Sequence, residues 1–285
     1  MVMSYLSSHD VFVTSPLVCR SWYVGTRRDL LWMPPIITTM QPFIIPSDLL
    51  KMYHEHIQSL TLNHNSYTER LKTVSLPKLR RLKLPYLPTT QFTYPLHRLR
   101  EFELANCLTL KRTACQRLSQ STRILKLCRL THAQLTHTIC PYTYLHTRSL
   151  RLARFGGFFS GDVWLRLSVS FPALRILSLS HCCTIPDMDT TGRWKNLSVI
   201  CLTDTSITTV GLIRLLSTTA GRLTHLKLHN NRSLDIRQLT PILHALCPLL
   251  QTLDIDPYAI PLLQSCNVKW RFGRKRFVRF VKHVY

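Results

Sequence analysis

One short pattern returns nine times along the chain and constrains the fold more than any other feature of the sequence. It runs apolar-x-x-apolar-x-Leu-x-x-Asn/Cys/other, and successive copies begin 22, 20, 23, 25, 27, 23, 26 and 27 residues apart. The copies are IQSLTLNHN from Ile57, LRRLKLPYL from Leu79, LREFELANC from Leu99, TRILKLCRL from Thr122, TRSLRLARF from Thr147, LRILSLSHC from Leu174, LSVICLTDT from Leu197, LTHLKLHNN from Leu223 and LQTLDIDPY from Leu250. This period predicts a solenoid, because each unit must bury its apolar side against its neighbours.

Each copy predicts a short strand, because its x-Leu-x-Leu core points alternate side chains inward. The residue three positions after the last leucine can bond to the backbone of the neighbouring turn. In four copies this residue is Asn65, Cys107, Cys182 or Asn231. The segments TVGLIRLLSTTAGRL from Thr209 and RQLTPILHALCPLL from Arg237 have apolar residues three and four positions apart, which predicts amphipathic helices.

The repeats resemble the leucine-rich-repeat family, in particular its cysteine-containing type, over residues 57–258. The resemblance implies an α/β fold, a curved solenoid with a parallel sheet on the concave face and helices or irregular turns outside. The early repeats of 20 to 23 residues contain prolines between their strands, so we expect them to lack regular helices. These prolines are Pro77, Pro85, Pro88 and Pro95. The family is one of binding proteins, which implies that the chain is not an enzyme.

The first 33 residues have a different pattern from the rest of the chain. Apolar residues interrupted by Pro16 and by the turn at 8–10 predict two or three short helices. The strings Ser4-Tyr5-Leu6, LVCRSWY at 17–23 and Leu31-Trp32 resemble an F-box. F-boxes ordinarily begin with a Leu-Pro pair ahead of Ser-Tyr-Leu, so we expect this chain to begin within the first helix.

An F-box implies delivery rather than catalysis: it contacts the Skp adaptor of a cullin-based ubiquitin ligase, while the repeats hold a protein substrate. By this resemblance, the adaptor-facing residues are drawn from Leu6, Leu17, Val18, Cys19, Trp22, Leu31 and Trp32. Alternatively, Leu17 and Trp22 fill the core of a small helical cap over the first repeat. Residues 34–56 are predicted to form a proline-containing linker and N-terminal cap.

The strand period also predicts a substrate surface, because the x positions point away from the core leucines into the concave face. We expect cations there to bind an acidic or phosphorylated segment. The predicted substrate-binding residues are Arg81, Lys83, His225, Lys227 and a central four, Lys126, Arg129, Arg151 and Arg154. As alternatives, such cations only keep the solenoid soluble, or Glu101 and Glu103 balance Arg81 and Lys83.

The C-terminal segment, residues 259–285, is basic and aromatic. It ends NVKWRFGRKRFVRFVKHVY, in which Trp270 and Phe272 alternate with cations and Gly273 opens a turn. This pattern predicts a hairpin that caps the solenoid. The alternatives are a nuclear import signal at residues 274–276 and a nucleic-acid contact in which Trp270 and Phe272 stack on bases.

The formal net charge of +23 indicates an anionic partner. MVMSYLSSHD has neither the basic start nor the apolar core of a signal peptide, so we expect the ten cysteines to be reduced thiols in the cytoplasm or nucleus. No apolar run reaches the roughly 20 residues that span a bilayer, which argues against a membrane partner.

The sequence contains no signature of catalysis or of a bound cofactor. It has no GxGxxG, GxxxxGK[S/T], HExxH or CxxC motif, and the adjacent Cys182 and Cys183 are too close to share a tetrahedral metal easily. Two functions stay open. The first is the substrate receptor of a cullin-based ligase, and the second is a basic scaffold that binds an acidic protein or RNA without a ligase role.

Overall fold

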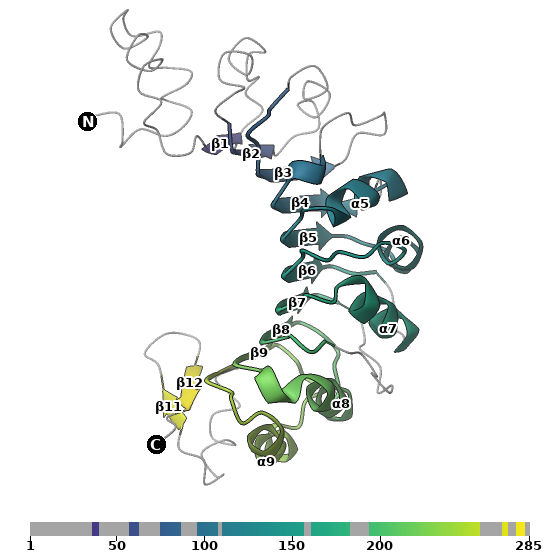
Figure 1. The fold of residues 1–285 in the computed structure, drawn as a ribbon. Helices are drawn as coiled ribbons and strands as arrows, with labels where there is room; N and C mark the ends of the chain where they lie inside the picture. Colours follow the sequence, from purple (N-terminus) through teal and green to yellow (C-terminus); the bar gives the residue numbers. More distant parts are fainter. Residues whose placement is uncertain are drawn as a thin grey trace, which may run out of the picture.

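The computed structural model describes residues 36–39, 57–62, 75–86, 96–107, 110–156, 161–182, 194–256, 270–272 and 278–282. Within these residues, parallel strands follow one another in chain order in one curved sheet (Figure 1). They are β1 Ile36–Thr39, β2 Ser59–Leu62, β3 Arg81–Tyr86, β4 Glu101–Asn106, β5 Ile124–Cys128, β6 Ser149–Ala153, β7 Ile176–Ser180, β8 Val199–Thr203, β9 His225–His229 and β10 Thr252–Ile255. The predicted solenoid is therefore confirmed.

All nine copies of the repeat place their x-Leu-x-Leu core on a strand, from β2 to β10. The register aligns the copies, since Leu150 of β6 lies between Leu125 of β5 and Leu177 of β7. The leucines of successive strands thus form continuous rows, and these three side chains are at most 1% exposed. Because the core is shared, each repeat buries its leucines only when it is stacked on its neighbours.

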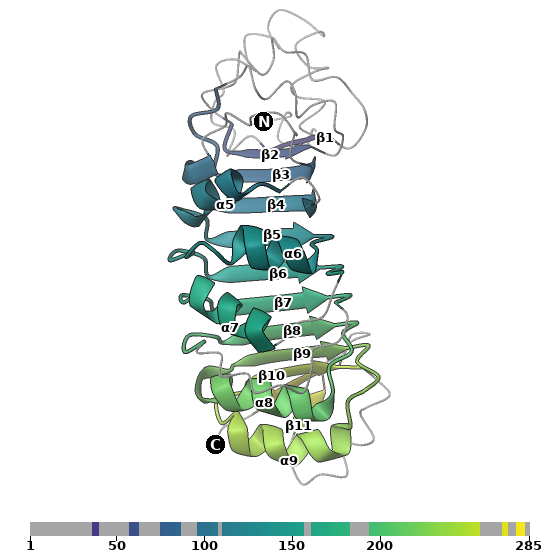
Figure 2. The same ribbon diagram turned by 90° about the vertical axis from the view of Figure 1, so that its right-hand side faces the viewer.

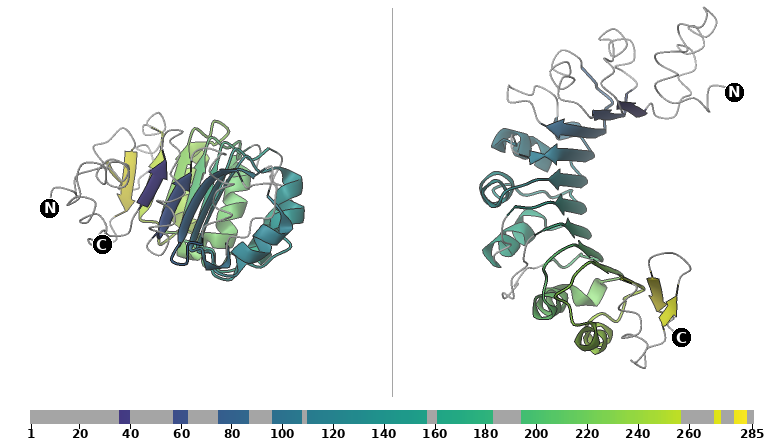
Figure 3. Two further views of the ribbon diagram at one scale, coloured as in Figure 1. Left: turned by 90° about the horizontal axis from the view of Figure 1, so that it is seen from above. Right: turned by 180° about the vertical axis from the view of Figure 1, so that it is seen from behind.

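Helices cover one face of the sheet and leave the other face open. The helices lie on the convex side of the arc in Figure 1 and cross in front of the strands in Figure 2. Figure 3 shows the same two layers from above and from behind. The helical elements are the 3₁₀ turns η3 Leu96–Arg98 and η6 Ala220–Arg222, the π-helical turn η5 Leu135–Ile139, and α5 Arg112–Ser119, α6 His132–Gln134, α7 Gly161–Ser170, α8 Thr209–Thr219 and α9 Ile236–Leu246.

Two helix predictions are confirmed and one expectation is wrong. α8 and α9 occupy the two segments predicted to be amphipathic helices, and Asp235 caps α9 by accepting bonds from the Arg237 and Gln238 amides. The repeat that begins at Leu99 was expected to lack a regular helix, yet it contains α5. The named prolines all precede this repeat, and Ala114, Cys115 and Leu118 give α5 a buried face. In the two preceding repeats, residues 63–74 and 87–95 lie outside the described residues.

Aromatic side chains fill the space between the sheet and its helices near the middle of the stack. Trp164 of α7 meets Trp194 edge to face, with ring centroids 5.3 Å apart. Tyr144 and Phe171 are stacked at 4.5 Å. These four rings are at most 2% exposed. They stabilise the core through the apolar area that they bury and through their stacked and edge-to-face contacts.

The two ends of the sheet differ. At the carboxyl end, β11 Trp270–Phe272 and β12 Val278–Lys282 form the predicted hairpin, and β12 also pairs antiparallel with β10. At the amino end, β1 pairs in parallel with β2, so the segment predicted as linker and cap contributes a strand. The F-box-like segment, residues 1–33, lies outside the described residues.

Candidate binding surface on the concave face

The open face of the sheet is lined by the side chains that alternate with the core leucines. On β5, for example, Leu125 and Leu127 are buried while Ile124 and Lys126 are half-buried. The same alternation recurs on β4 and β7. The x positions therefore form one continuous surface, as predicted.

Two glutamates on β4 neutralise part of this surface. Register places Glu103 between Lys83 of β3 and Lys126 of β5. Glu103 carboxylate oxygens lie 2.7 Å from Lys83 Nζ and 3.5 Å from Lys126 Nζ. Glu101 lies 2.6 Å from Lys126 Nζ and 3.8 Å from Arg81 Nε. The alternative that the glutamates balance Arg81 and Lys83 is confirmed, and the balance extends to Lys126.

These contacts also shift the protonation of Glu103. Partial burial by itself raises the pKa of the Glu103 carboxyl, but the hydrogen bonds and charges of Lys83 and Lys126 outweigh it and lower the pKa below its ordinary value. Glu103 is therefore ionised at neutral pH. The carboxylate forms a stable part of the face, and Lys83 and Lys126 are engaged within the protein.

Three of the four predicted arginines form no ion pair with the described residues. Arg151 lies on β6 beside Lys126, and Arg129 and Arg154 follow directly after β5 and β6. All three are exposed. We call these residues the arginine patch. Guanidinium groups present planar donors that match carboxylate and phosphate, so this patch is the part of the face best suited to bind an anion.

The backbone fixes the position of two of these arginines. Residues that follow β5 to β9 adopt left-handed conformations with φ between 50 and 55°. They are Arg129, Arg154, His181, Asp204 and Asn230. The Arg129 amide donates to Ala153 O at 2.9 Å, and the Arg154 amide donates to Ser180 O at 2.8 Å. Each strand end is thus hydrogen-bonded to the next repeat. The backbone positions from which the Arg129 and Arg154 side chains extend are therefore fixed.

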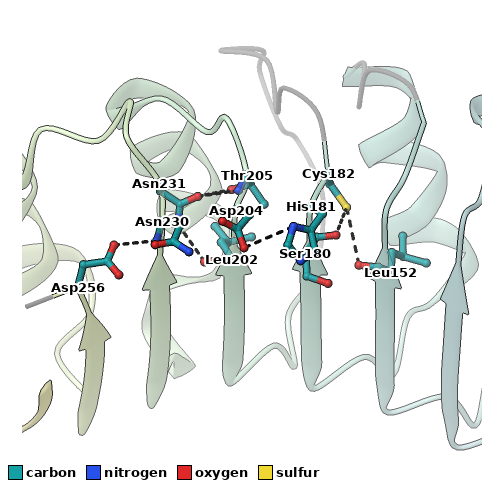
Figure 4. A network of polar contacts seen from close by, with 10 residues as sticks. All are labelled: Leu152, Ser180, His181, Cys182, Leu202, Asp204, Thr205, Asn230, Asn231 and Asp256. Carbon is teal, nitrogen blue, oxygen red and sulfur yellow. Dashed lines mark hydrogen bonds and ion pairs between the residues drawn. The ribbon is translucent and has the colours of Figure 1, made fainter. Parts of the chain in front are cut away.

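The last member of this row uses a side chain as its acceptor. The Asn230 amide donates to Asp256 Oδ2 at 2.7 Å, and His181 Nδ1 lies 3.4 Å from Asp204 Oδ2 (Figure 4). The row therefore changes from arginines at β5 and β6 to acidic and amide side chains toward β10. Within this row of left-handed residues, arginine therefore occurs only after β5 and β6.

The predicted Asn and Cys positions are confirmed where they are described. Asn231 Nδ2 donates to Leu202 O at 2.9 Å, and its Oδ1 accepts from Thr205 N at 3.0 Å and Thr205 Oγ1 at 2.6 Å (Figure 4). Cys182 Sγ lies 3.7 Å from Leu152 O and 3.4 Å from Ser180 O. Cys107 is buried, and Asn65 lies outside the described residues.

The predicted residues of β9 are separate from the arginine patch. Lys227 Nζ lies 4.0 Å from Asp254 Oδ2, and His225 Nδ1 lies 2.8 Å from Thr224 Oγ1. Between β6 and β9, the x positions of β7 and β8 are neutral. They hold Ile176, Ser178, Val199 and Cys201, all half-buried. The structure thus divides the predicted cations into a paired group on β3 to β5, the arginine patch, and a small group on β9.

The described residues contain no group of three or more His, Cys, Asp or Glu side chains that could hold a metal ion. Burial raises the pKa values of the Cys107 and Cys115 thiols to about 12, which keeps both protonated and poorly nucleophilic. In the same part of the chain, no helix has the length and apolarity needed to cross a membrane.

The sequence interpretation missed a second row of cations. The residue directly before the first concave position is arginine in five successive repeats. These are Arg80, Arg100, Arg123, Arg148 and Arg175, and all five are exposed. The signal is present in the aligned copies as Leu/Thr-Arg at the second position, which precedes the strand positions that predict the concave face. We call this row the arginine ladder.

Comparisons with known proteins give a structural match only. No family model matches the chain, and no curated protein matches its sequence. Among solved structures, it is similar to a chain of the "Crystal structure of Rad7 and Elc1 complex in yeast", with a TM-score of 0.55 and 18% identity. The match covers 92% of this chain and 75% of that chain. At this identity the similarity shows the fold, and it agrees with a leucine-rich-repeat solenoid.

Proposed function

We propose that the chain is the substrate-recognition subunit of an SCF-type cullin-RING ubiquitin ligase. In this proposal, residues 1–33 bind the Skp adaptor, and the concave face binds an acidic or phosphorylated segment of a protein substrate. The protein has no catalytic step and needs no cofactor, because its task is to hold two other proteins together. It works in the cytoplasm, the nucleus or both.

The observation that carries the substrate half is the arginine patch. Arg129, Arg151 and Arg154 are exposed and lack carboxylate partners among the described residues, whereas Lys83 and Lys126 beside them are paired. A phosphate group can accept two parallel bonds from one guanidinium. The half-buried Ile176 and Val199 on the next strands supply apolar contacts for the neighbouring residues of a peptide.

The adaptor half rests on the sequence. The strings at residues 4–6, 17–23 and 31–32 resemble an F-box and lie ahead of the repeats, which begin at Ile57. A solenoid of similar fold occurs in a crystal structure of a two-protein complex, which supports a role in binding proteins. The adaptor contacts are drawn from Leu6, Leu17, Val18, Cys19, Trp22, Leu31 and Trp32.

Co-purification of the full chain with the Skp adaptor tests the adaptor half. We expect the native chain to bind and the double variant Leu17→Ala, Trp22→Ala to lose the adaptor, because both substitutions remove apolar contact area. Because the same side chains would fill a helical cap in the alternative, thermal unfolding of the variant serves as a control. Loss of the adaptor with unchanged unfolding supports the proposal, and an adaptor that never binds the native chain contradicts it.

Peptide binding tests the substrate half. We expect a phosphorylated peptide to bind more tightly than its unphosphorylated form, and the double variant Arg151→Gln, Arg154→Gln to remove this preference. The double variant Arg232→Gln, Arg237→Gln removes the same charge from exposed positions near α9 and should keep the preference. Equal losses in the two variants would show that net charge, and not the arginine patch, determines binding.

The second candidate is a basic scaffold that binds an anionic partner without a ligase role. It shares the concave face but does not need residues 1–33. The two candidates differ in one result: a scaffold binds its partner and never the Skp adaptor. The net charge of +23 favours an anionic partner in both cases.

A further inference from the structure

The arginine ladder is a regular array built by the backbone. The Arg100 amide donates to Arg80 O at 2.8 Å, the Arg123 amide donates to Arg100 O at 2.7 Å, and the same bond recurs from Arg148 and Arg175 at 2.8 Å each. Each arginine is therefore stacked directly on the arginine of the preceding repeat. Neighbouring strands are about 4.8 Å apart, so the five positions extend over about 19 Å.

The ladder has no acidic counterpart at its own positions. The equivalent residues in the later repeats are Ser198, Thr224 and Gln251, which are neutral. One bond is found for the ladder side chains among the described residues, from Arg80 Nη1 to Arg98 O at 3.3 Å. Glu101, the nearest acid in sequence, is engaged with Arg81 and Lys126.

Such an array is unfavourable for the free protein. Like charges on adjacent strands repel, and five exposed arginines in one row lose stability relative to neutral residues. The ladder positions themselves have no apolar or aromatic side chain that would anchor a protein partner through a buried contact. At the ladder positions, a partner therefore gains its binding energy from charge and charge-assisted hydrogen bonds.

Charge density selects between two kinds of anionic partner. An extended acidic peptide points alternate side chains to one face, so its carboxylates on that face are about 6.6 Å apart and number about three over the length of the ladder. A nucleic-acid duplex has one phosphate for each 1.7 Å or so of helix axis when both strands are counted, so it carries about eleven charges over the same length. Arginine also matches phosphate geometry with paired donors.

We propose that the arginine ladder binds the phosphate backbone of a nucleic acid, independently of base sequence. The ladder lies at the amino-terminal ends of β3 to β7, whereas the arginine patch lies at the middle and carboxyl ends of β5 and β6. Nucleic-acid binding at this edge therefore leaves most of the concave face accessible. It does not depend on a ligase role or on residues 1–33.

The test is the salt dependence of binding between the full chain and a 20-base-pair DNA duplex of arbitrary sequence. The triple variant Arg100→Gln, Arg123→Gln, Arg148→Gln should lower the steepness of log K against log salt by about 2.7, at about 0.9 for each lost phosphate contact. The triple variant with lysine at the same positions keeps the charge and should keep the slope. The control Arg214→Gln, Arg232→Gln, Arg237→Gln removes the same charge elsewhere and should also keep it.

Three results would overturn the proposal. The native chain fails to bind the duplex, the two glutamine variants lose the same slope, or polyglutamate binds more tightly than the duplex through the same arginines. The last result assigns the ladder to an acidic protein. Thermal unfolding of each variant separates binding from folding, and we expect the ladder glutamine variant to unfold no earlier than the native chain at low salt, because repulsion has been removed.

Discussion

At the scale of single residues, Glu101 and Glu103 decide how much positive charge the concave face presents. Both lie on β4, where Glu103 is flanked by Lys83 of β3 and Lys126 of β5, and together they engage Arg81, Lys83 and Lys126. Replacing them frees three cations without adding any. The sequence pattern indicated a balance with Arg81 and Lys83 only. Their further partner Lys126 lies on β5, the strand on the other side of β4.

The double variant Glu101→Gln, Glu103→Gln should therefore bind an acidic or phosphorylated peptide more tightly, by about tenfold if one freed cation contributes about 1.4 kcal/mol. Isothermal titration with one peptide against both proteins measures this effect. Asp162→Asn, which removes an acid from the convex helix α7, is the control and should leave the affinity unchanged. A weaker complex would mean that the glutamates contact the peptide themselves.

Glu103 also makes stability depend on pH in a defined direction. Because its pKa is lowered from 4.5 in the folded protein, the unfolded chain takes up its proton first as pH falls. The stabilisation by Glu103 is thus present above about pH 4.5 and is lost as pH falls through the lowered value. The Glu103→Gln variant should be less stable at pH 7 by about 1 kcal/mol, since the pair is partly exposed. Urea unfolding at pH 7 and pH 3 should show this difference shrinking, and a constant difference would contradict it.

At the scale of elements, the strands could be predicted from sequence and some of their neighbours could not. The x-Leu-x-Leu core recurs in every copy, so local periodicity was enough to place β2 to β10. The short helix α5 was missed, because its eight residues, RTACQRLS, contain few apolar side chains and the repeat is only 23 residues long. The arginines of the ladder can be aligned from the sequence, but their stacking on one another follows only from the backbone bonds between successive turns.

Asn231 shows how one side chain joins two repeats. It is 4% exposed and bonds to Leu202 O and to both Thr205 donors, so its three partners lie in the preceding repeat. Asn231→Ala leaves these buried groups unpaired and should lower the free energy of unfolding by about 3 kcal/mol. Asn196→Ala, at an exposed turn, is the control and should cost less than about 1 kcal/mol. Equal losses in chemical denaturation would show that the buried bonds contribute nothing particular.

At the scale of the whole molecule, an open stack of strands must protect its ends. β12 pairs with β10 from Thr252 to Ile255, so the hairpin satisfies the backbone edge that the last repeat would otherwise present. An unpaired edge strand binds other strands, including those of a second copy. The tail therefore has a structural task that is independent of its charge, whatever else its cations contact.

Removing residues 257–285 should expose the β10 edge and produce dimers or larger assemblies, because the freed amide and carbonyl groups can pair between copies. Removing residues 283–285 alone leaves β11 and β12 in place and should leave the oligomeric state of the full chain unchanged. Light scattering on both truncated chains at several concentrations measures the difference. If the longer deletion leaves mass and thermal unfolding unchanged, the hairpin is not what protects this end, and a role for the tail in partner binding gains weight.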